Sequence, residues 1–288
     1  KPVPQKIEKI DGVQKQEVDL VVVGAGGAGL SAAVTAKDLG AKNVLIVEKM
    51  PVVGGNTLRC ASAFNAADPE RQKALPMTDT LKDAVVKAIN EKPANEEHKK
   101  LMADVKAKYE AYLKSGSKTL FDCPEWHALQ TYNGGDKVGH IPLIRTYANN
   151  VLDTLHWMQS KGSPVMDRVS QGAGALWQRT HQLDAPAGLG LVDPLYQDAV
   201  KQGVNFKLGT RVTDLVLDKS GKVIGITAED KVGNKYQILS KNGVILATGG
   251  YSQNKEMRQK SAPHLTPDMV STNQPGATGD GITIATRH

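Results

Sequence analysis

The chain lacks the cysteine and histidine patterns that mark several kinds of redox and metal centre. Its 288 residues include two cysteines, Cys60 and Cys123, which stand in no Cys-x-x-Cys or Cys-x-x-Cys-His arrangement. The sequence therefore predicts neither a dithiol redox centre nor a haem attachment site within the chain. The seven histidines show no metal-ligand spacing, so no metal is predicted and most of them are interpreted as surface or core residues.

Long apolar runs and basic blocks are also missing. The longest apolar runs have the length of a strand, far below the roughly 20 residues that a membrane-spanning helix needs. The net charge is +6, but lysines and arginines are spread along the chain, and aromatic residues make up 5% of it. A nucleic acid partner is therefore not expected. A lysine-rich solvated surface is the favoured interpretation, and docking of an acidic protein is the alternative.

The glycine-rich stretch near the N-terminus predicts a nucleotide-binding turn. The apolar run Val18 to Val23 is interpreted as one buried parallel strand, and it ends directly on Gly24-x-Gly26-x-x-Gly29. Small apolar residues then recur at helical spacing from Leu30 to Leu39. Glycines at these spacings allow a tight turn, a close approach of backbone to a diphosphate and close packing of helix on strand.

An acidic residue supports this interpretation. A second apolar strand from Asn43 to Val47 ends on Glu48, nineteen residues after Gly29. A carboxylate at this distance is expected to accept hydrogen bonds from ribose hydroxyls, and it would repel the 2′-phosphate of NADP.

Two further glycine turns favour FAD over a nicotinamide cofactor. Gly54-Gly55-Asn56-Thr57 follows the acidic strand end, where an extended FAD would pass, and a late apolar strand ends on Ala247-Thr248-Gly249-Gly250. Each turn alone is compatible with ordinary turn chemistry. Together they favour FAD.

The remaining pattern predicts an α/β fold: a Rossmann-like FAD-binding domain with a parallel sheet, helices, a small antiparallel β-meander and a helical insertion. A polar lead-in is expected over residues 1–16, the FAD-binding domain over 17–288, and the helical or irregular insertion over about 78–162. Helices are predicted over 79–114 with a break at Pro93, over 143–161, and up to Lys201 with Pro194 inside. Irregular surface is predicted over 115–141 and a flexible stretch over 172–190. Short strands are predicted at 206–208, 212–217, 223–227, 235–239 and 244–246, with a hairpin turn at 219–222.

Several motifs resemble the soluble fumarate reductase flavoproteins, the flavocytochrome c, urocanate and methacrylate reductase group of the succinate dehydrogenase and fumarate reductase flavoprotein family. The resemblance covers about residues 17–285. Its motifs are Gly24-Ala-Gly-Gly-Ala-Gly29, Glu48-Lys49, Gly54-Gly-Asn56, Asn65-Ala-Ala67, Arg179-Thr-His181, Ile245-Leu-Ala-Thr-Gly-Gly250 and Ser271-Thr-Asn-Gln-Pro-Gly-Ala-Thr-Gly-Asp-Gly281.

The resemblance implies an FAD-dependent oxidoreductase that transfers hydride from flavin N5 to an α,β-unsaturated carboxylate. It also implies a separate cytochrome or other electron donor and a periplasmic location, with a cytoplasmic location as the alternative. Membrane-bound members tether FAD through a histidine at the position of Asn56, so noncovalent FAD is expected here. By position, the resemblance implies flavin contacts from Ala28, Gly29, Glu48, Asn56, Thr57, Ala61, Ser62, Val212 and Asp280. The glycine turns and strand ends add Gly24, Ala25, Gly26, Gly27, Lys49, Gly54, Gly55, Ala247, Thr248 and Gly249 as predicted cofactor-binding residues.

This chain departs from that pattern near the expected substrate. Ser62-Ala63 replaces a Gly-Gly pair of the fumarate-reducing members, and Gln171 replaces a methionine. These departures disfavour fumarate itself. Trp177 either shapes a pocket for a larger acid or packs in the core.

The C-terminal part of the family pattern is expected to lie beyond His288. Gly279-Asp280-Gly281 predicts a helix start with Asp280 as its cap, and in the family this helix continues into a clamp domain, followed by a final FAD-binding segment. The proton-donating arginine and the substrate-binding arginines and histidines belong there, so no catalytic residue is assigned. Arg59, Arg179 and Arg211 are interpreted as structural.

The chain is accordingly interpreted as the N-terminal portion of an enoate reductase, inactive alone, with the remaining part of the parent protein as a partner. The alternatives are a non-catalytic flavin-binding redox module and an FAD-dependent dehydrogenase such as a ketosteroid dehydrogenase. The start at Lys1-Pro-Val-Pro is interpreted as a sequence from which a targeting peptide has been removed or never included.

Overall fold

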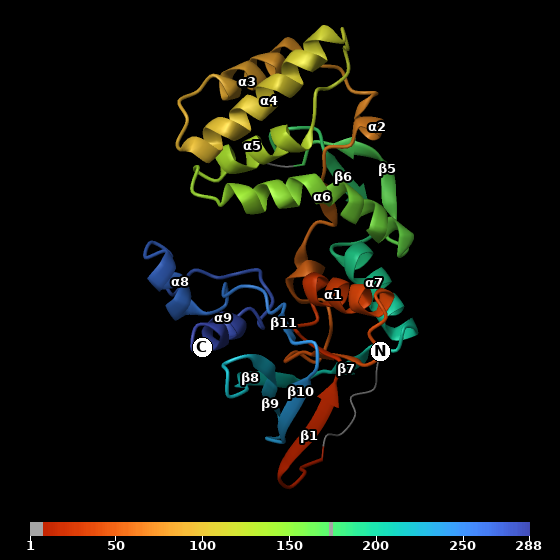
Figure 1. Cartoon of the computed structure of the whole chain (residues 1–288), viewed down its shortest axis with the longest axis vertical. Coiled ribbons are helices and arrows are strands. Elements are labelled where there is room, and N and C mark those ends of the chain that lie inside the picture. Colours follow the sequence, from red (N-terminus) through yellow and green to blue (C-terminus); the bar gives the residue numbers. More distant parts are fainter. Residues whose placement is uncertain (1–7, 173–174) are drawn as a thin grey trace. The chain divides into compact units, whose positions relative to one another are not determined.

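The structure is a computed structural model that describes residues 8–172 and 175–288. Two compact units make up the chain (Figure 1). The nucleotide unit comprises Lys1–Ala61 and Ala185–His288, described from residue 8 on, and the helical unit comprises Ser62–Asp184. The helical unit extends on both sides of the insertion expected at about 78–162, because short strands at its two ends belong to it.

A parallel sheet forms the centre of the nucleotide unit. Its strand order is β11-β2-β3-β7, and every neighbouring pair is parallel. Every residue of β2 and β3 is buried, as expected for continuous apolar runs covered on both faces. Helices α1 and α7 pack against each other, and α1 also contacts β2 and β3. These elements are β2 (Leu20–Val23), β3 (Val44–Val47), β7 (Asn205–Lys207), β11 (Val244–Leu246), α1 (Gly27–Asp38) and α7 (Leu189–Lys201).

A second sheet in the same unit has the order β1-β10-β9-β8. Strand β1 is parallel to β10, whereas β10, β9 and β8 form the predicted antiparallel meander. The hairpin turn is confirmed, since Asp218 and Lys222 are joined by a backbone hydrogen bond of 2.9 Å. The strands are β1 (Val13–Val18), β8 (Thr210–Leu217), β9 (Val223–Asp230) and β10 (Lys235–Ser240).

The structure corrects two predictions at the start of the chain. Residues 13–16, expected in the polar lead-in, belong to β1, and residues 1–7 of that lead-in lie outside the described residues. The single strand predicted from Val18 to Val23 is in fact two strands in different sheets. Asp19 separates them, because its carboxylate accepts hydrogen bonds from the backbone N–H groups of Lys42 and Asn43 at 3.0 and 2.8 Å. The polar residue Asp19 within the apolar run was the sequence signal for this division into two strands.

The helical unit contains a small antiparallel sheet of order β4-β6-β5 together with its helices. The predicted break at Pro93 is confirmed, since one helix ends at Ile89 and the next begins at Glu96. Thr78 and Asn95 cap these two helices through side-chain oxygens, which satisfies backbone N–H groups of the first turn. The elements are β4 (Ala63–Asn65), β5 (Val165–Ser170), β6 (Thr180–Leu183), α2 (Pro69–Gln72), α3 (Asp79–Ile89), α4 (Glu96–Lys114), α5 (Pro124–Gly134) and α6 (Ile141–Ser160).

Two segments predicted to be irregular contain regular secondary structure. The stretch 115–141 contains α5, which begins with Pro124 in its first turn and Cys123 as its cap. Proline fits that first turn because no helical partner is lost there. The stretch 172–190 contains β6, in which Thr180, His181 and Leu183 are buried. Residues 173 and 174 of that stretch lie outside the described residues.

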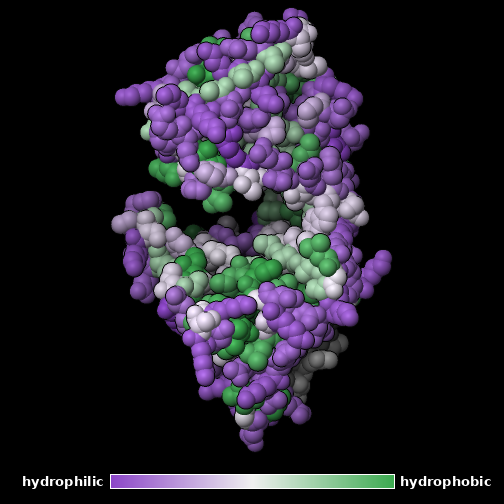
Figure 2. Space-filling view, in the orientation of Figure 1, coloured by the Kyte–Doolittle hydropathy of each residue, from purple (hydrophilic) through white to green (hydrophobic). Residues whose placement is uncertain are grey.

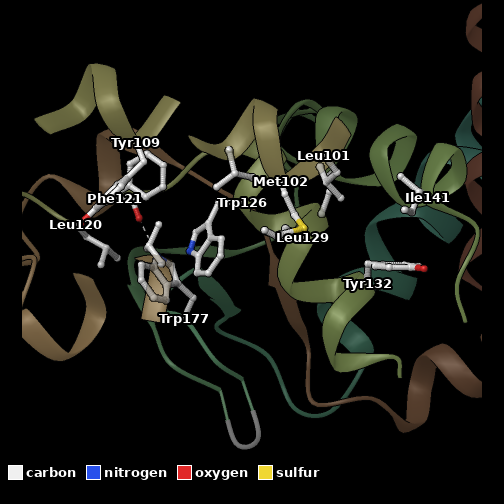
Figure 3. Packing of buried hydrophobic residues seen from close by; sticks show 14 of the residues in the cluster. Leu101, Met102, Tyr109, Leu120, Phe121, Trp126, Leu129, Tyr132, Ile141 and Trp177 are labelled. Carbon is white, nitrogen blue, oxygen red and sulfur yellow. Dashed lines mark hydrogen bonds between the residues drawn. The ribbon is translucent and has the colours of Figure 1, made fainter. Parts of the chain in front are cut away.

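Aromatic residues fill the core of the helical unit. Trp126 and Trp177 meet edge to face with ring centroids 5.2 Å apart, and Nε1 of Trp177 donates a hydrogen bond to the carbonyl of Phe121 (Figure 3). The surface of this unit visible in Figure 2 is mostly hydrophilic. Trp177 is therefore a core residue, as the core-packing interpretation expected.

Candidate functional site

The glycine turn joins β2 to α1 in a conformation that requires glycine. Gly24 has φ +106°, a backbone conformation that residues with a side chain rarely adopt. A Cβ at Gly29 would lie 1.9 Å from the carbonyl oxygen of Gly24, so no side chain fits there. Helix α1 begins at Gly27, and its N-cap, Gly26, makes no side-chain capping bond. The turn thus presents the N-terminus of a helix with backbone in place of side chains.

A second glycine turn packs directly on the first. Gly54 has φ +111°, and its backbone N–H donates to the carbonyl of Ala25 at 2.7 Å. The hydroxyl of Thr57 accepts a hydrogen bond from the backbone N–H of Gly27 at 3.0 Å. Thr57 lies in the short 3-10 helix η1 (Gly55–Arg59), which Gly54 begins. The two glycine turns therefore lie side by side, although the bonded residues Gly27 and Thr57 are 30 residues apart in sequence.

Glu48 follows the last residue of β3 and turns its carboxylate toward the glycine turn. Oε2 accepts a hydrogen bond from the backbone N–H of Ala25 and Oε1 accepts one from that of Met50, each at 2.8 Å. The carboxylate therefore lies at the carboxyl edge of the parallel sheet, where open α/β sheets bind their ligands.

A cavity of about 580 Å³ opens at this edge of the sheet. The predicted residues that line it are Gly24, Gly26, Gly27, Ala28, Glu48, Lys49, Gly55, Asn56, Thr57, Val212, Ala247, Thr248, Gly249 and Asp280. Its size falls within the range of roughly 300–1,000 Å³ found for small-molecule and cofactor sites.

Five predicted residues are not part of the cavity lining. Ala25, Gly29 and Gly54 support the two glycine turns from behind, through the backbone contacts given above. Ala61 ends the first segment of the nucleotide unit, and Ser62 is buried in the helical unit with φ +53°.

Sequence reasoning missed several lining residues. Met50 and Leu246 lie next to predicted positions, and Thr210 is the first residue of β8, so the strand ends themselves were their signal. Gln274, Gly276 and Ala277 come from the Ser271-to-Gly281 motif, which was quoted for the resemblance and not as cavity lining.

A charge cluster lies at one end of the cavity. Arg211 donates to both carboxylate oxygens of Asp280, from Nε at 2.8 Å and from a terminal nitrogen at 3.1 Å. Nζ of Lys49 lies 3.1 Å from the same carboxylate. Although burial opposes ionisation, hydrogen bonds from Arg211, Thr278 and Lys49 lower the pKa of Asp280 to about 2. Asp280 is therefore ionised at neutral pH.

The predicted role of Asp280 as a helix cap is wrong. Helix α9 (Asp280–Ala285) has Gly279 as its N-cap, with φ +77° and no side-chain capping bond. The carboxylate of Asp280 binds the two cations instead.

Two of the arginines near the resemblance motifs form ion pairs. In the helical unit, Arg179 donates to both oxygens of Asp122, at 3.0 and 2.7 Å, and their side chains are only 5% and 1% exposed. Arg211 binds Asp280. These contacts agree with the structural interpretation of both arginines.

Metal and disulfide chemistry find no support in the described residues. Cys60 and Cys123 are not joined in a disulfide. Across residues 8–172 and 175–288, no group of three or more His, Cys, Asp and Glu side chains could hold a metal ion. None of the helices in those ranges is both long and apolar enough to cross a membrane.

The profile of the FAD binding domain family matches residues 19–113 and 109–288. The chain belongs to this FAD-binding domain family. The expected cofactor, FAD, and the expected resemblance to fumarate reductase flavoproteins are thereby confirmed.

Named relatives of this FAD-binding domain are reductases. The chain is 35% identical over 288 residues to the NADH:acrylate oxidoreductase of Vibrio harveyi, covering 94% of this chain and 28% of that protein. It is 34% identical to the fumarate reductase (cytochrome) of Shewanella frigidimarina, covering 93% of this chain and 39% of that protein. The chain thus spans about a third of the length of these relatives.

A solved structure shows the same fold. The open conformation of a flavocytochrome c3 fumarate reductase matches with a TM-score of 0.74 and 30% identity, covering 100% of this chain and 46% of that one. A 3-ketosteroid-Δ4-(5α)-dehydrogenase from Rhodococcus jostii RHA1 matches with a TM-score of 0.67 at 21% identity, which indicates a shared fold alone.

The cavity of this domain fits FAD by its chemistry. Gly24, Gly26 and Gly27 line the cavity without side chains, so a diphosphate can approach the backbone. Glu48 places a carboxylate in the cavity lining, and the strand-end residues Val23 and Leu246 make part of that lining apolar.

Proposed function

We propose that this domain binds FAD noncovalently in the cavity at the carboxyl edge of its parallel sheet, as part of a reductase of α,β-unsaturated carboxylates. One observation carries the proposal: two glycine turns far apart in sequence, a strand-end carboxylate and the Ala247–Gly249 turn converge on one cavity. The names of the relatives at 30% identity or more, which include acrylate, fumarate and urocanate reductases, support the reductase assignment.

The residues have distinct proposed roles in binding. Backbone N–H groups at the start of α1, those of Gly26 and Ala28, hold the diphosphate, while that of Gly27 is bound by Thr57. Glu48 accepts hydrogen bonds from ribose hydroxyls, because an ionised acceptor strengthens them. Asn56 and Thr57 approach the cofactor from η1, while Val212 and the Ala247–Gly249 turn close on it from β8 and β11.

The role proposed for the residues of this chain is to hold the cofactor. Bound FAD would supply the hydride for reduction of the carbon–carbon double bond. No proton donor is assigned within the chain, since the guanidinium groups of Arg179 and Arg211 are held by Asp122 and Asp280. The proton donor and substrate-binding groups are proposed to lie in other parts of the parent protein.

We also propose that electrons arrive from a separate donor, such as a cytochrome, and that the parent protein works in the periplasm. The name of the Shewanella relative, fumarate reductase (cytochrome), supports the first part. The resemblance to the soluble fumarate reductases supports the second.

Single-turnover reduction tests this proposal. The parent protein, loaded with FAD and reduced photochemically without oxygen, is mixed in turn with acrylate, fumarate, urocanate and cinnamate. Reoxidation of the flavin by at least one enoate is expected. Failure of all four acids would contradict the reductase proposal, and reduction of the flavin by a 3-ketosteroid would favour the dehydrogenase alternative.

A further inference from the structure

A segment late in the chain lies along the cavity and is fastened at both of its ends. We call residues 274–280 the strap. At one end, the backbone N–H of Gln274 donates to Oδ1 of Asn56 at 2.6 Å. At the other end, the carboxylate of Asp280 binds Lys49 and Arg211. All five of these residues line the cavity, so both fastenings lie at its wall.

The Asp280 fastening uses both oxygens of the carboxylate. Oδ2 accepts from Nε of Arg211 at 2.8 Å and from Nζ of Lys49 at 3.1 Å. Oδ1 accepts from Arg211 at 3.1 Å and from the hydroxyl of Thr278 at 2.8 Å. Two parallel bonds from one guanidinium fix its orientation as well as adding energy. This end therefore joins the start of β8, the end of β3 and the start of α9.

Small residues allow the strap to lie directly on the cavity wall. A Cβ at Gly276 would meet the side chain of Met50 at 3.0 Å and that of Lys49 at 3.3 Å. A Cβ at Gly281, just past the strap, would lie 2.1 Å from Oγ1 of Thr248. Side chains at these two positions would push the strap away from the ends of β3 and β11.

We propose that the strap must open at the Asp280 end for FAD to leave, so that Arg211 and Lys49 act through Asp280 as positioning residues that slow cofactor release. This inference rests on the proposed FAD site. The strap lines the cavity between Gln274, which is bound by Asn56, and Asp280, which is bound by Lys49. These partners lie 218 and 231 residues away in sequence, so the strap connects cavity walls from distant parts of the chain. Contacts that close a site act mainly on the dissociation rate.

The test measures FAD release from the full chain. Released FAD is followed by its fluorescence after rapid dilution of the loaded protein, for Arg211→Gln, Asp280→Asn and the double variant. Asp104→Asn is the matched control, because Asp104 forms an ion pair of 2.6 Å with Arg145 in the helical unit. Thermal unfolding of each FAD-free variant reports whether it is folded.

The strap predicts that Arg211→Gln and Asp280→Asn each raise the release rate about tenfold. The double variant should release FAD no faster than the faster single variant, because Arg211 acts through Asp280. The control should release FAD at the unmodified rate. Since the Arg211 side chain is 65% exposed, 1 M KCl should accelerate release from the unmodified chain more than from Arg211→Gln, in which the Lys49–Asp280 pair remains.

Several results would overturn the inference. Release from Arg211→Gln within twofold of the unmodified rate, or multiplicative effects in the double variant, would show that Arg211 does not act through Asp280. If Arg211→Gln fails to fold, the folded Asp280→Asn variant carries the test, and an unchanged release rate in that variant would also refute the strap. If the chain takes up FAD but shows these results, the strap inference is refuted and the proposed FAD site is not. A chain that takes up no FAD refutes the proposed function, and the strap with it.

Discussion

Each unit holds an arginine in a two-bond ion pair with an aspartate, but the two pairs lie in different surroundings. In the helical unit, Arg179 and Asp122 bind each other deep in the interior, and Gln72 donates to the same carboxylate at 2.6 Å. In the nucleotide unit, Arg211 and Asp280 form a similar two-bond pair at the wall of a cavity, with the arginine side chain 65% exposed. The same chemistry therefore stabilises the interior of one unit and borders a binding site in the other.

The difference extends to the aromatic and backbone groups. Trp126, which lies in α5, and Trp177, which lies near the Arg179 motif, are enclosed in the core of the helical unit. The nucleotide unit instead leaves glycine backbone and the Glu48 carboxylate along its cavity. Proximity of a residue to a motif in sequence is thus weaker evidence for function than placement at the carboxyl edge of the parallel sheet.

Breaking the buried pair should give the largest effect. Arg179→Met leaves Asp122 as an uncompensated buried carboxylate, so we expect the free energy of unfolding to fall by about 3–5 kcal/mol. Urea unfolding measures this loss, and FAD affinity measured in the same variant should stay within about twofold. A tenfold loss of FAD affinity without a loss of stability would place Arg179 in the cofactor site and end the contrast between the units.

Acid should destabilise the helical unit through His127. Burial, with a smaller contribution from the nearby Arg179 cation, lowers the pKa of His127 to about 3. The unfolded chain takes up this proton near pH 6.5, whereas the folded chain does not, so stability is full above pH 6.5 and falls as the pH drops toward 3. Between pH 7 and pH 4 this group should account for a loss of about 3 kcal/mol.

His127→Phe keeps an aromatic ring beside Tyr147, whose centroid lies 5.5 Å from that of His127. Denaturant unfolding at both pH values should show a smaller loss for this variant than for the unmodified chain. Equal losses in the two proteins would mean that His127 titrates normally.

A side chain at the glycine turn should strongly weaken cofactor binding. In Gly29→Val, the new Cβ meets the carbonyl of Gly24, which moves the turn away from a diphosphate. We expect FAD affinity to fall at least about 100-fold, or about 2.7 kcal/mol. Gly134→Ala is the control, since a Cβ there meets nothing within 4 Å. Titration with FAD compares the two, and undiminished affinity in Gly29→Val would contradict the assigned cradle.

Removing the charge of Glu48 should give the smallest effect. Glu48→Gln keeps the shape of the side chain but replaces a charged acceptor, so we expect FAD affinity to fall about tenfold. Binding of riboflavin, which lacks the diphosphate and the adenosine ribose, should not change. An equal loss for both ligands would show that Glu48 does not act on the ribose.

The sequence predicted those parts of the cavity that depend on residues close together in the chain. The apolar run of β2, the glycine spacings and Glu48 at the end of β3 are each determined within a few residues, and the structure brings them together at one edge of the sheet. The helix break at Pro93 was predictable for the same reason, since proline cannot continue a helix.

The failures have nonlocal causes. Pro124 indicated a loop, but the apolar and aromatic face of α5 is buried by other helices and stabilises a helix there. Asp280 had the composition of a helix cap, yet its partners are 69 and 231 residues away in sequence. No local pattern identifies such partners, because they depend on how the two sheets of the nucleotide unit are assembled.

Equilibrium titration of the chain with FAD tests the central claim most directly. The account predicts uptake of one FAD per chain, release of unmodified FAD on denaturation, and no competition from NADP at tenfold excess. A chain that binds no FAD, that retains it covalently after denaturation, or that loses it to NADP would contradict the account.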